Sequence, residues 1–241
     1  MKDNLYFISD AHLGVDLEGR KEREPALVRF LESIQDHAAQ LFIVGDLFEF
    51  WFEYKHLVPK GHVELLSQLR RMVCSGTQVH YIVGNHDFAL GPFLEKDIGI
   101  NLHWRPLHLE FQGKRFFVAH GDGLNKRDLG YRILKVVLRS KVSQALYRLL
   151  PPDFAMMLAQ RAADLSRSAT RKRNREGVAM AYRSVAFELL DAGFDYVVMG
   201  HTHYAEAQAH GKGLYINVSG WLDSYPYAEF SAGVLSLKYF K

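Results

Sequence analysis

Five short clusters of histidine, aspartate and asparagine stand out along the 241-residue chain. They read DAH at 10–12, GD at 45–46, GNHD at 84–87, HGD at 120–122 and GHTH at 200–203. A mixture of carboxylate, imidazole and amide ligands suits Mn²⁺, Fe²⁺ or Zn²⁺ and not the all-oxygen shell of Ca²⁺. Two such ions about 3.5–4 Å apart share a bridging ligand, and together they clamp a phosphoryl group and activate water. The clusters therefore predict a two-metal site for phosphoryl chemistry, with Asp46 as the natural bridge.

Each cluster stands at or just beyond the end of a short apolar run, and such runs indicate strands that are buried on both faces. The runs are LYFIS (5–9), LFIVG (41–45), VHYIVG (79–84), RFFVAH (115–120), YVVMGH (196–201) and LYINVSG (214–220). In open α/β sheets the carboxyl ends of neighbouring strands converge, so ligands that follow them are expected to meet. Glycines beside the ligands allow the backbone to turn sharply there.

Helical patterns between the early strands predict an α/β sandwich with helices packed outside the sheet. One pattern spans 25–39, with Pro25 in its first turn, and another spans 62–72 with apolar residues at helical spacing. The part from 214 to 239 indicates strands only, and so predicts a second sheet.

The segment from about 126 to 177 differs from the rest, and we interpret it as a helical cap inserted into a single domain spanning 1–241. A stripe of apolar residues with helical spacing runs through 129–146, Pro151 and Pro152 end it, and a second helix follows from Asp153. Residues 126–175 carry 13 Lys and Arg against three acids, a balance of +10, whereas the remainder carries 17 against 24, or −7. A basic segment in an acidic body indicates an anionic partner: phosphate, a nucleotide, nucleic acid or an anionic membrane surface.

Composition and the start of the chain bound the class of protein. A hydrophobic content of 48% with 24% charged residues is typical of a folded globular chain. A lone cysteine, Cys74, excludes an intramolecular disulfide. The opening MKDNLYFISD lacks the features of a secretory signal, and no window approaches the roughly 18 apolar residues of a membrane-spanning helix. We expect a cytoplasmic protein, either soluble or held peripherally at a membrane.

The motif order DxH, GDxxE, GNHD, HGD and GHTH resembles the signature of the calcineurin-like metallophosphoesterases and spans 10–203. The resemblance implies a four-layer α/β/β/α sandwich. It also implies a first metal held by Asp10, His12 and His203 with Asp46, and a second held by Asn85, His120 and His201 with Asp46. By the same resemblance, His86 stabilises the transition state or protonates the leaving oxygen, Asn85 offsets developing charge, and Asp87 orients the ring of His86.

The stretches GDLFEFWFEY (45–54), GNHDF (84–88) and HGDGL (120–124) resemble, more closely, the UDP-2,3-diacylglucosamine diphosphatases of bacterial lipid A synthesis. That family cleaves the pyrophosphate to UMP and the lipid 1-phosphate, usually with Mn²⁺. The resemblance implies a UDP-linked glycolipid as substrate, a cap whose apolar helices shelter acyl chains, and peripheral contact with the inner membrane surface. Asp128 and Tyr131 match positions of that family and are predicted substrate contacts, together with His86. In the basic segment, Arg167 and Lys172 are candidates for contact with a phosphate of the substrate.

One position departs from the closer family, because its well-studied members carry arginine where this chain has His86. Histidine there is the choice of the broader superfamily, so another nucleotide or phosphodiester substrate stays open as an alternative. The apolar cap argues against nucleic acid, which favours basic residues interleaved with exposed aromatics. A second alternative is a non-catalytic metal-binding scaffold. Glu49 is interpreted as a supporting or structural residue, and the sequence leaves the oligomeric state open.

Overall fold

The computed structural model describes residues 2–14, 22–87, 89–124, 140–170, 175–221 and 224–241. Its helices are α1 (Arg23–Ile34), α2 (Val63–Cys74), α4 (Lys141–Tyr147), α5 (Pro152–Thr170) and α6 (Arg175–Asp191), with short helical turns η1 (Lys60–His62) and η2 (Leu94–Ile98). Its strands are β1 (Asn4–Ile8), β2 (Ala38–Ile43), β3 (Gln78–Ile82), β4 (Asn101–His103), β5 (Leu107–Phe111), β6 (Lys114–Ala119), β7 (Tyr196–Met199), β8 (Glu206–His210), β9 (Gly213–Asn217), β10 (Pro226–Ser231) and β11 (Val234–Tyr239).

The strands form two sheets. One has the order β11-β10-β1-β2-β3-β4 and the other β5-β6-β7-β9-β8. Strands β1 to β4 are parallel, as are β6, β7 and β9, so the ends of these strands open toward one edge of each sheet. All six predicted strands are present. The second sheet is not a C-terminal unit, however, because β10 returns to pair antiparallel with β1.

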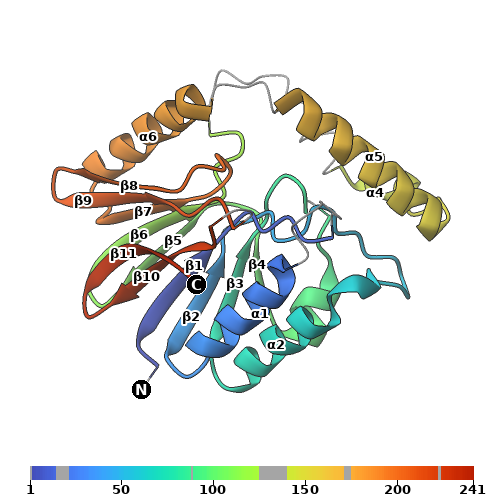
Figure 1. Ribbon diagram of the computed structural model, residues 1–241, viewed down its shortest axis with the longest axis horizontal. Helices are drawn as coiled ribbons and strands as arrows, with labels where there is room; N and C mark the ends of the chain where they lie inside the picture. Colours follow the sequence, from blue (N-terminus) through green and yellow to red (C-terminus); the bar gives the residue numbers. More distant parts are fainter. Residues whose placement is uncertain (1, 15–21, 88, 125–139, 171–174, 222–223) are drawn as a thin grey trace.

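Four layers result, as Figure 1 shows, with α1 and α2 on the outer face of the first sheet and α6 over the second. Between the sheets, large side chains such as Phe7, Phe42 and Phe116 are fully buried, and the rings of Phe7 and Phe42 stack with centroids 4.7 Å apart. The pairing of β10 with β1 adds Phe230 to this layer. The predicted α/β/β/α sandwich is confirmed.

Helix α1 is held on the first sheet by a one-sided apolar stripe. Leu27, Phe30, Leu31 and Ile34 recur at the three- and four-residue spacing that places them on one face, and all four are buried. On the opposite side of the molecule, buried residues of α6 pack against β7 and β9 in the same way. These helices fix the sheets whose ends carry the chemical clusters.

Helices α4 and α5 lie within the segment predicted as a cap. The ring of Tyr147 in α4 packs on Phe52, with centroids 4.6 Å apart, and the hydroxyl of Tyr54 donates to the carbonyl of Leu150 at 3.3 Å. Residues 125–139 and 171–174, which complete the predicted cap, lie outside the described residues, and the boundaries of the cap stay a prediction. Among the described helices, none has the length and apolar character needed to cross a membrane.

Candidate metal centre

Backbone hydrogen bonds join the turns that follow the strands. The amide of Asp10 donates to the carbonyl of Gly45 at 3.1 Å, which ties the turn after β1 to the turn after β2. The amide of Gly200 donates to the carbonyl of His120 at 3.0 Å, which does the same for β6 and β7. A bond from the amide of His201 to Asp10 Oδ2, at 2.9 Å, links the two sheets. The amide of His86 donates to Asp46 Oδ1 at 2.9 Å and brings in the remaining cluster, so all five converge on one place.

Five of the predicted ligands adopt left-handed backbone conformations. Their φ angles are 55° at Asp10, 45° at His12, 52° at Asp46, 74° at His201 and 52° at His203. Such angles are uncommon outside glycine, and cost of order 1–3 kcal/mol each. Local strain gathered on candidate ligands is typical of a functional site, where the surrounding structure enforces a geometry that the chain alone does not prefer.

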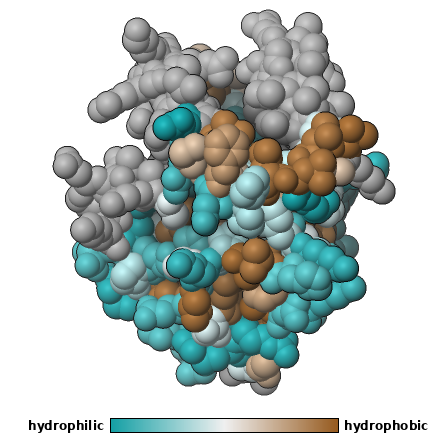
Figure 2. Space-filling view, turned by 90° about the vertical axis from the view of Figure 1, so that its right-hand side faces the viewer, coloured by the Kyte–Doolittle hydropathy of each residue, from teal (hydrophilic) through white to brown (hydrophobic). Residues whose placement is uncertain are grey.

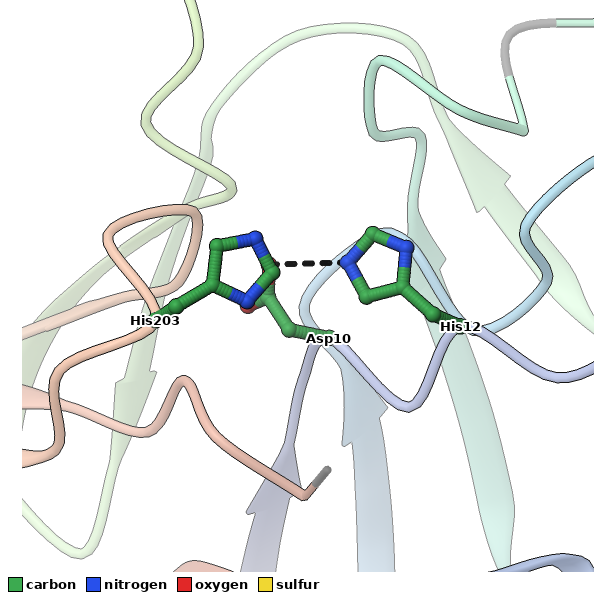
Figure 3. A group of neighbouring side chains, drawn as sticks. All are labelled: Asp10, His12 and His203. Atoms are coloured by element: carbon green, nitrogen blue, oxygen red, sulfur yellow. Dashed lines mark ion pairs between the residues drawn. The ribbon is translucent and has the colours of Figure 1, made fainter. Parts of the chain in front are cut away.

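A first ligand group consists of Asp10, His12 and His203, whose side chains point toward one another (Figure 3). Nε2 of His12 lies 3.8 Å from Asp10 Oδ1, and Nε2 of His203 lies 4.0 Å from the same oxygen. Asp10 Oδ1, His12 Nε2 and His203 Nδ1 are buried and have no hydrogen-bond partner. Buried polar atoms without partners are costly, and a divalent cation is a group that would satisfy them.

A second ligand group surrounds Nε2 of His120. That nitrogen lies 3.1 Å from Asn85 Oδ1, 3.3 Å from Asp46 Oδ2 and 3.2 Å from Nδ1 of His201. Asp46 Oδ2 also lies 3.9 Å from Nε2 of His12 in the first group. The carboxylate of Asp46 therefore stands between the two groups, in the position that a bridging ligand requires.

Each central carboxylate divides its two oxygens between the protein and the site. Oδ2 of Asp10 lies 2.5 Å from the Ser9 hydroxyl and accepts the amide of His201, which leaves Oδ1 facing the histidines. Oδ1 of Asp46 accepts the amide of His86 at 2.9 Å, which leaves Oδ2 facing both groups. Sequence reasoning missed Ser9, because a serine at the end of a buried strand carries no signal of its own.

The electrostatics of the centre favour added positive charge. Burial lowers the pKa of His12, yet the nearby carboxylates, Asp10 foremost, raise it to about 10. Burial also lowers the pKa of His120, but the nearby carboxylates, Asp46 foremost, raise it to about 10. These imidazoles are therefore held as cations beside carboxylates, and a divalent cation bound there would replace their protons.

The two remaining histidines are held neutral. Burial, together with the charge of His120, lowers the pKa of His201 to about 4. Burial is also the main reason that the pKa of His203 falls to about 4. Neutral imidazole is the form that ligates metals, so these side chains are ready to bind at neutral pH.

His86 and Asp87 have different surroundings from those that the resemblance implied. The carboxylate of Asp87 accepts the amides of Leu47 and Gly84, at 2.9 Å and 3.0 Å, and the hydroxyl of Tyr81. It therefore fixes two turns, and the hydrogen bonds of its carboxylate go to these groups and not to the ring of His86. The acceptors near Nδ1 of His86 come from a different residue, Glu49, whose backbone carbonyl lies at 3.3 Å and whose carboxylate lies at 3.5 Å.

The predicted substrate contacts are placed only in part. His86 lies beside the first ligand group, with its ligand atom within 4.8 Å of those of His12 and Asp46. Asp128, Tyr131 and Lys172 lie outside the described residues. Arg167 is in α5, at a position where the side chain is outside the described part of the structure.

Another buried residue supports the first turn without any signal in the sequence. Arg23, at the start of α1, donates from Nη1 to the carbonyls of Ala11 and His12 at 2.9 Å and 3.0 Å. It is buried although it is charged. Its guanidinium therefore holds the strained turn that carries Asp10 and His12, a role that only the folded structure reveals.

Comparison with known sequences decides the family. The sequence profile described as calcineurin-like phosphoesterase matches residues 4–205. The chain belongs to this family. As a calcineurin-like phosphoesterase it is a metal-dependent hydrolase, and the family predicted from the five motifs is confirmed.

Relatives of this phosphoesterase match it over most of their length. It is 28% identical to a UDP-2,3-diacylglucosamine hydrolase of Porphyromonas gingivalis, over 99% of this chain and 98% of the relative. It is 33% identical to a protein of the same name from Photorhabdus laumondii, over 89% of each chain. A third, from Pseudomonas putida, is 32% identical over 83% of this chain and 81% of its own. The closer resemblance drawn from the sequence is confirmed.

Proposed function

We propose that this phosphoesterase hydrolyses the pyrophosphate of UDP-2,3-diacylglucosamine to UMP and 2,3-diacylglucosamine 1-phosphate, a step of lipid A synthesis. The observation that carries the proposal is the convergence of two ligand groups on Asp46, in a chain that matches relatives of that name almost end to end. The alternative of a non-catalytic scaffold is disfavoured, because every expected ligand side chain is present and faces the centre.

Asp10, His12 and His203 would hold one divalent ion, and Asn85, His120 and His201 another, with Asp46 between them. The donor set suits Mn²⁺, with Fe²⁺ or Zn²⁺ as alternatives. The ions would supply Lewis acidity toward a phosphoryl group and lower the pKa of bound water. The described residues fit this use, because each residue of the first group has a buried polar atom without a hydrogen-bond partner.

The protein contributes orientation and charge. His86 is held against Asp46 by its backbone amide, and its partly exposed ring leaves one edge open to a substrate. It is therefore placed to donate a proton toward the leaving phosphate oxygen or to offset charge that develops there. Asn85, adjacent in sequence, presents its amide oxygen to the same centre.

The cap helices supply the apolar surface that a lipid substrate needs. Among the described side chains, the large exposed apolar residues of α4, α5 and the turn between them are Val142, Leu146, Leu149, Phe154, Met157 and Leu158. Hydrophobic side chains also gather on the face of the molecule seen in Figure 2. Exposed apolar groups of this extent mark interaction surfaces, and we infer shelter for acyl chains and peripheral contact with the inner membrane.

The test is hydrolysis of UDP-2,3-diacylglucosamine by purified protein in detergent with Mn²⁺, measured as release of UMP. Asp46→Ala is the matched control, because it removes the ligand shared by both groups. Release of UMP that requires the metal and fails in Asp46→Ala is expected. No release from the lipid, with bis(p-nitrophenyl) phosphate still cleaved, would keep the phosphodiesterase and discard the lipid substrate.

A further inference from the structure

Glu49 contacts two imidazoles of the centre with one carboxylate. Its Oε2 lies 2.8 Å from Nδ1 of His12, and its Oε1 lies 3.5 Å from Nδ1 of His86. The side chain of Glu49 is only 6% exposed. The backbone carbonyl of Glu49 also lies 3.3 Å from Nδ1 of His86. An ionised carboxylate and a carbonyl only accept hydrogen bonds, so both Nδ1 atoms must carry their protons. Nε2 of His12 is then the atom left to face Asp10 and Asp46.

The backbone places Glu49 opposite His12 by a short parallel ladder. The amide of His12 donates to the carbonyl of Asp46 at 3.0 Å, that of Leu13 to Leu47 at 2.9 Å, and that of Glu49 to Leu13 at 2.9 Å. Because this ladder fixes the register of the two turns, the three-residue spacing from Asp46 to Glu49 brings the carboxylate to the His12 ring. The position of Glu49 at the site is therefore fixed by the backbone hydrogen bonds between the two turns.

We propose that Glu49 is a positioning residue that sets the ring orientation of His12 and His86 together, and that it strengthens metal binding at the first ligand group alone. The inference rests on the proposed function, because it concerns the same centre. A carboxylate behind a ligating histidine fixes the ring and raises its basicity, and loss of such a partner costs 10–100-fold in metal affinity.

The second ligand group has a different support. Nδ1 of His120 lies 2.8 Å from the carbonyl of Val44 and donates to it. A neutral carbonyl raises the basicity of the ring less than a carboxylate does, so the two groups differ in the residue behind their buried histidine. Removal of the charge on Glu49 is expected to weaken one metal and to leave the other.

The experiment compares Glu49→Gln and Glu49→Ala with Glu53→Gln. Glu53 is a matched control, because it is equally buried but bonds to Trp51, Gly91 and Phe93, away from the ligands. Calorimetric titration with Zn²⁺ measures both metal affinities in each protein. Spectra of histidine labelled with ¹⁵N, with and without Zn²⁺, report the hydrogen-bonded Nδ1 protons of His12 and His86.

In Glu49→Ala the hydrogen-bonded Nδ1 signal of His12 is expected to be lost, whereas that of His86 is expected to shift and persist, because the backbone carbonyl 3.3 Å away remains. In Glu49→Gln the amide has one oxygen for two rings, so at least one of the two Nδ1 signals is expected to change. One metal should bind 10–100-fold more weakly in both variants, while Glu53→Gln keeps wild-type affinities and signals. Equal weakening of both metals, or unchanged Nδ1 signals in Glu49→Ala, would overturn the inference. Failure of the wild type to bind Zn²⁺ or to cleave any phosphoester would contradict the proposed function instead. The Nδ1 proton signals of the metal-free proteins would still test whether Glu49 orients the two rings.

Discussion

Substitution of Gly84 by alanine tests whether the position of Asp46 controls the centre. A Cβ at Gly84 would lie 2.1 Å from Asp46 Oδ1 and 2.6 Å from the backbone nitrogen of Asp46. Relief requires the first separation to grow by about 0.9 Å, to the 3.0 Å below which real Cβ contacts are essentially absent. Asp46 must then move as a whole, because its backbone is blocked as well. Misplacement by about 1 Å in an active site costs on the order of 10²-fold in rate, or about 2.7 kcal/mol of activation free energy.

The assay is cleavage of bis(p-nitrophenyl) phosphate at saturating Mn²⁺, together with urea unfolding. Gly84→Ala is expected to lose about 100-fold in kcat and, because it overpacks the turn, about 1–3 kcal/mol of unfolding free energy. Gly61→Ala is the control, because no atom lies within 4 Å of the Cβ it would add. Wild-type kcat and metal content in a folded Gly84→Ala protein would refute the reasoning that ties the rate to Asp46.

Three other predictions concern pH, metal and a buried amide. Burial, with the charge of His103, lowers the pKa of His80 to about 4 from 6.5, so its stabilising contribution is complete above pH 6.5 and is lost as the pH falls toward 4. Urea titrations should show the stability of wild type relative to His80→Phe falling by about 1–2 kcal/mol over that window, after a discount for partial exposure. Chelation should lower the melting temperature, because ligand at 100 times its Kd adds about 2.7 kcal/mol, and Asp46→Ala should abolish this response. Asn217 donates to the carbonyl of Gly200 at 2.9 Å and accepts the amide of Ser219. Asn217→Ala should lower the free energy of unfolding in urea by about 1–3 kcal/mol. It should also lower kcat, because Gly200 precedes His201.

The sequence was sufficient for the six strands that carry the ligand clusters or lie beside them and for the family, and the reason is physical. Ligand clusters at strand ends combine two strong signals, since a buried parallel strand needs an apolar run and a metal needs polar donors just beyond it. The placing of β10 was not predictable in the same way. An alternating strand such as Pro226–Ser231 fits either sheet, and the choice depends on where Phe230 finds room between the layers.

The supporting residues around the ligands were the part that sequence reasoning could not assign. Asp87 and Glu49 are both acids close to a ligand in sequence, and the resemblance predicted that Asp87 orients the ring of His86. In the structure, Asp87 accepts hydrogen bonds from backbone amides and from Tyr81, and Glu49 lies beside the ring of His86. Arg23 is further from any motif. Roles of this kind depend on the register between turns, which spacing within a single segment does not contain.

Strain and charge in the centre have a common origin in the demands of metal binding. Asp10 and Asp46 each commit one oxygen to backbone amides, and their left-handed φ angles turn the other oxygen inward. Amides that point at a carboxylate keep it ionised after burial, which an isolated buried acid would resist. The cost of the backbone geometry is thus tied to the arrangement that keeps two negative charges close together. The charge of the two buried carboxylates is offset by imidazolium partners when no metal is bound, yet it is best satisfied by cations that bind both acids at once.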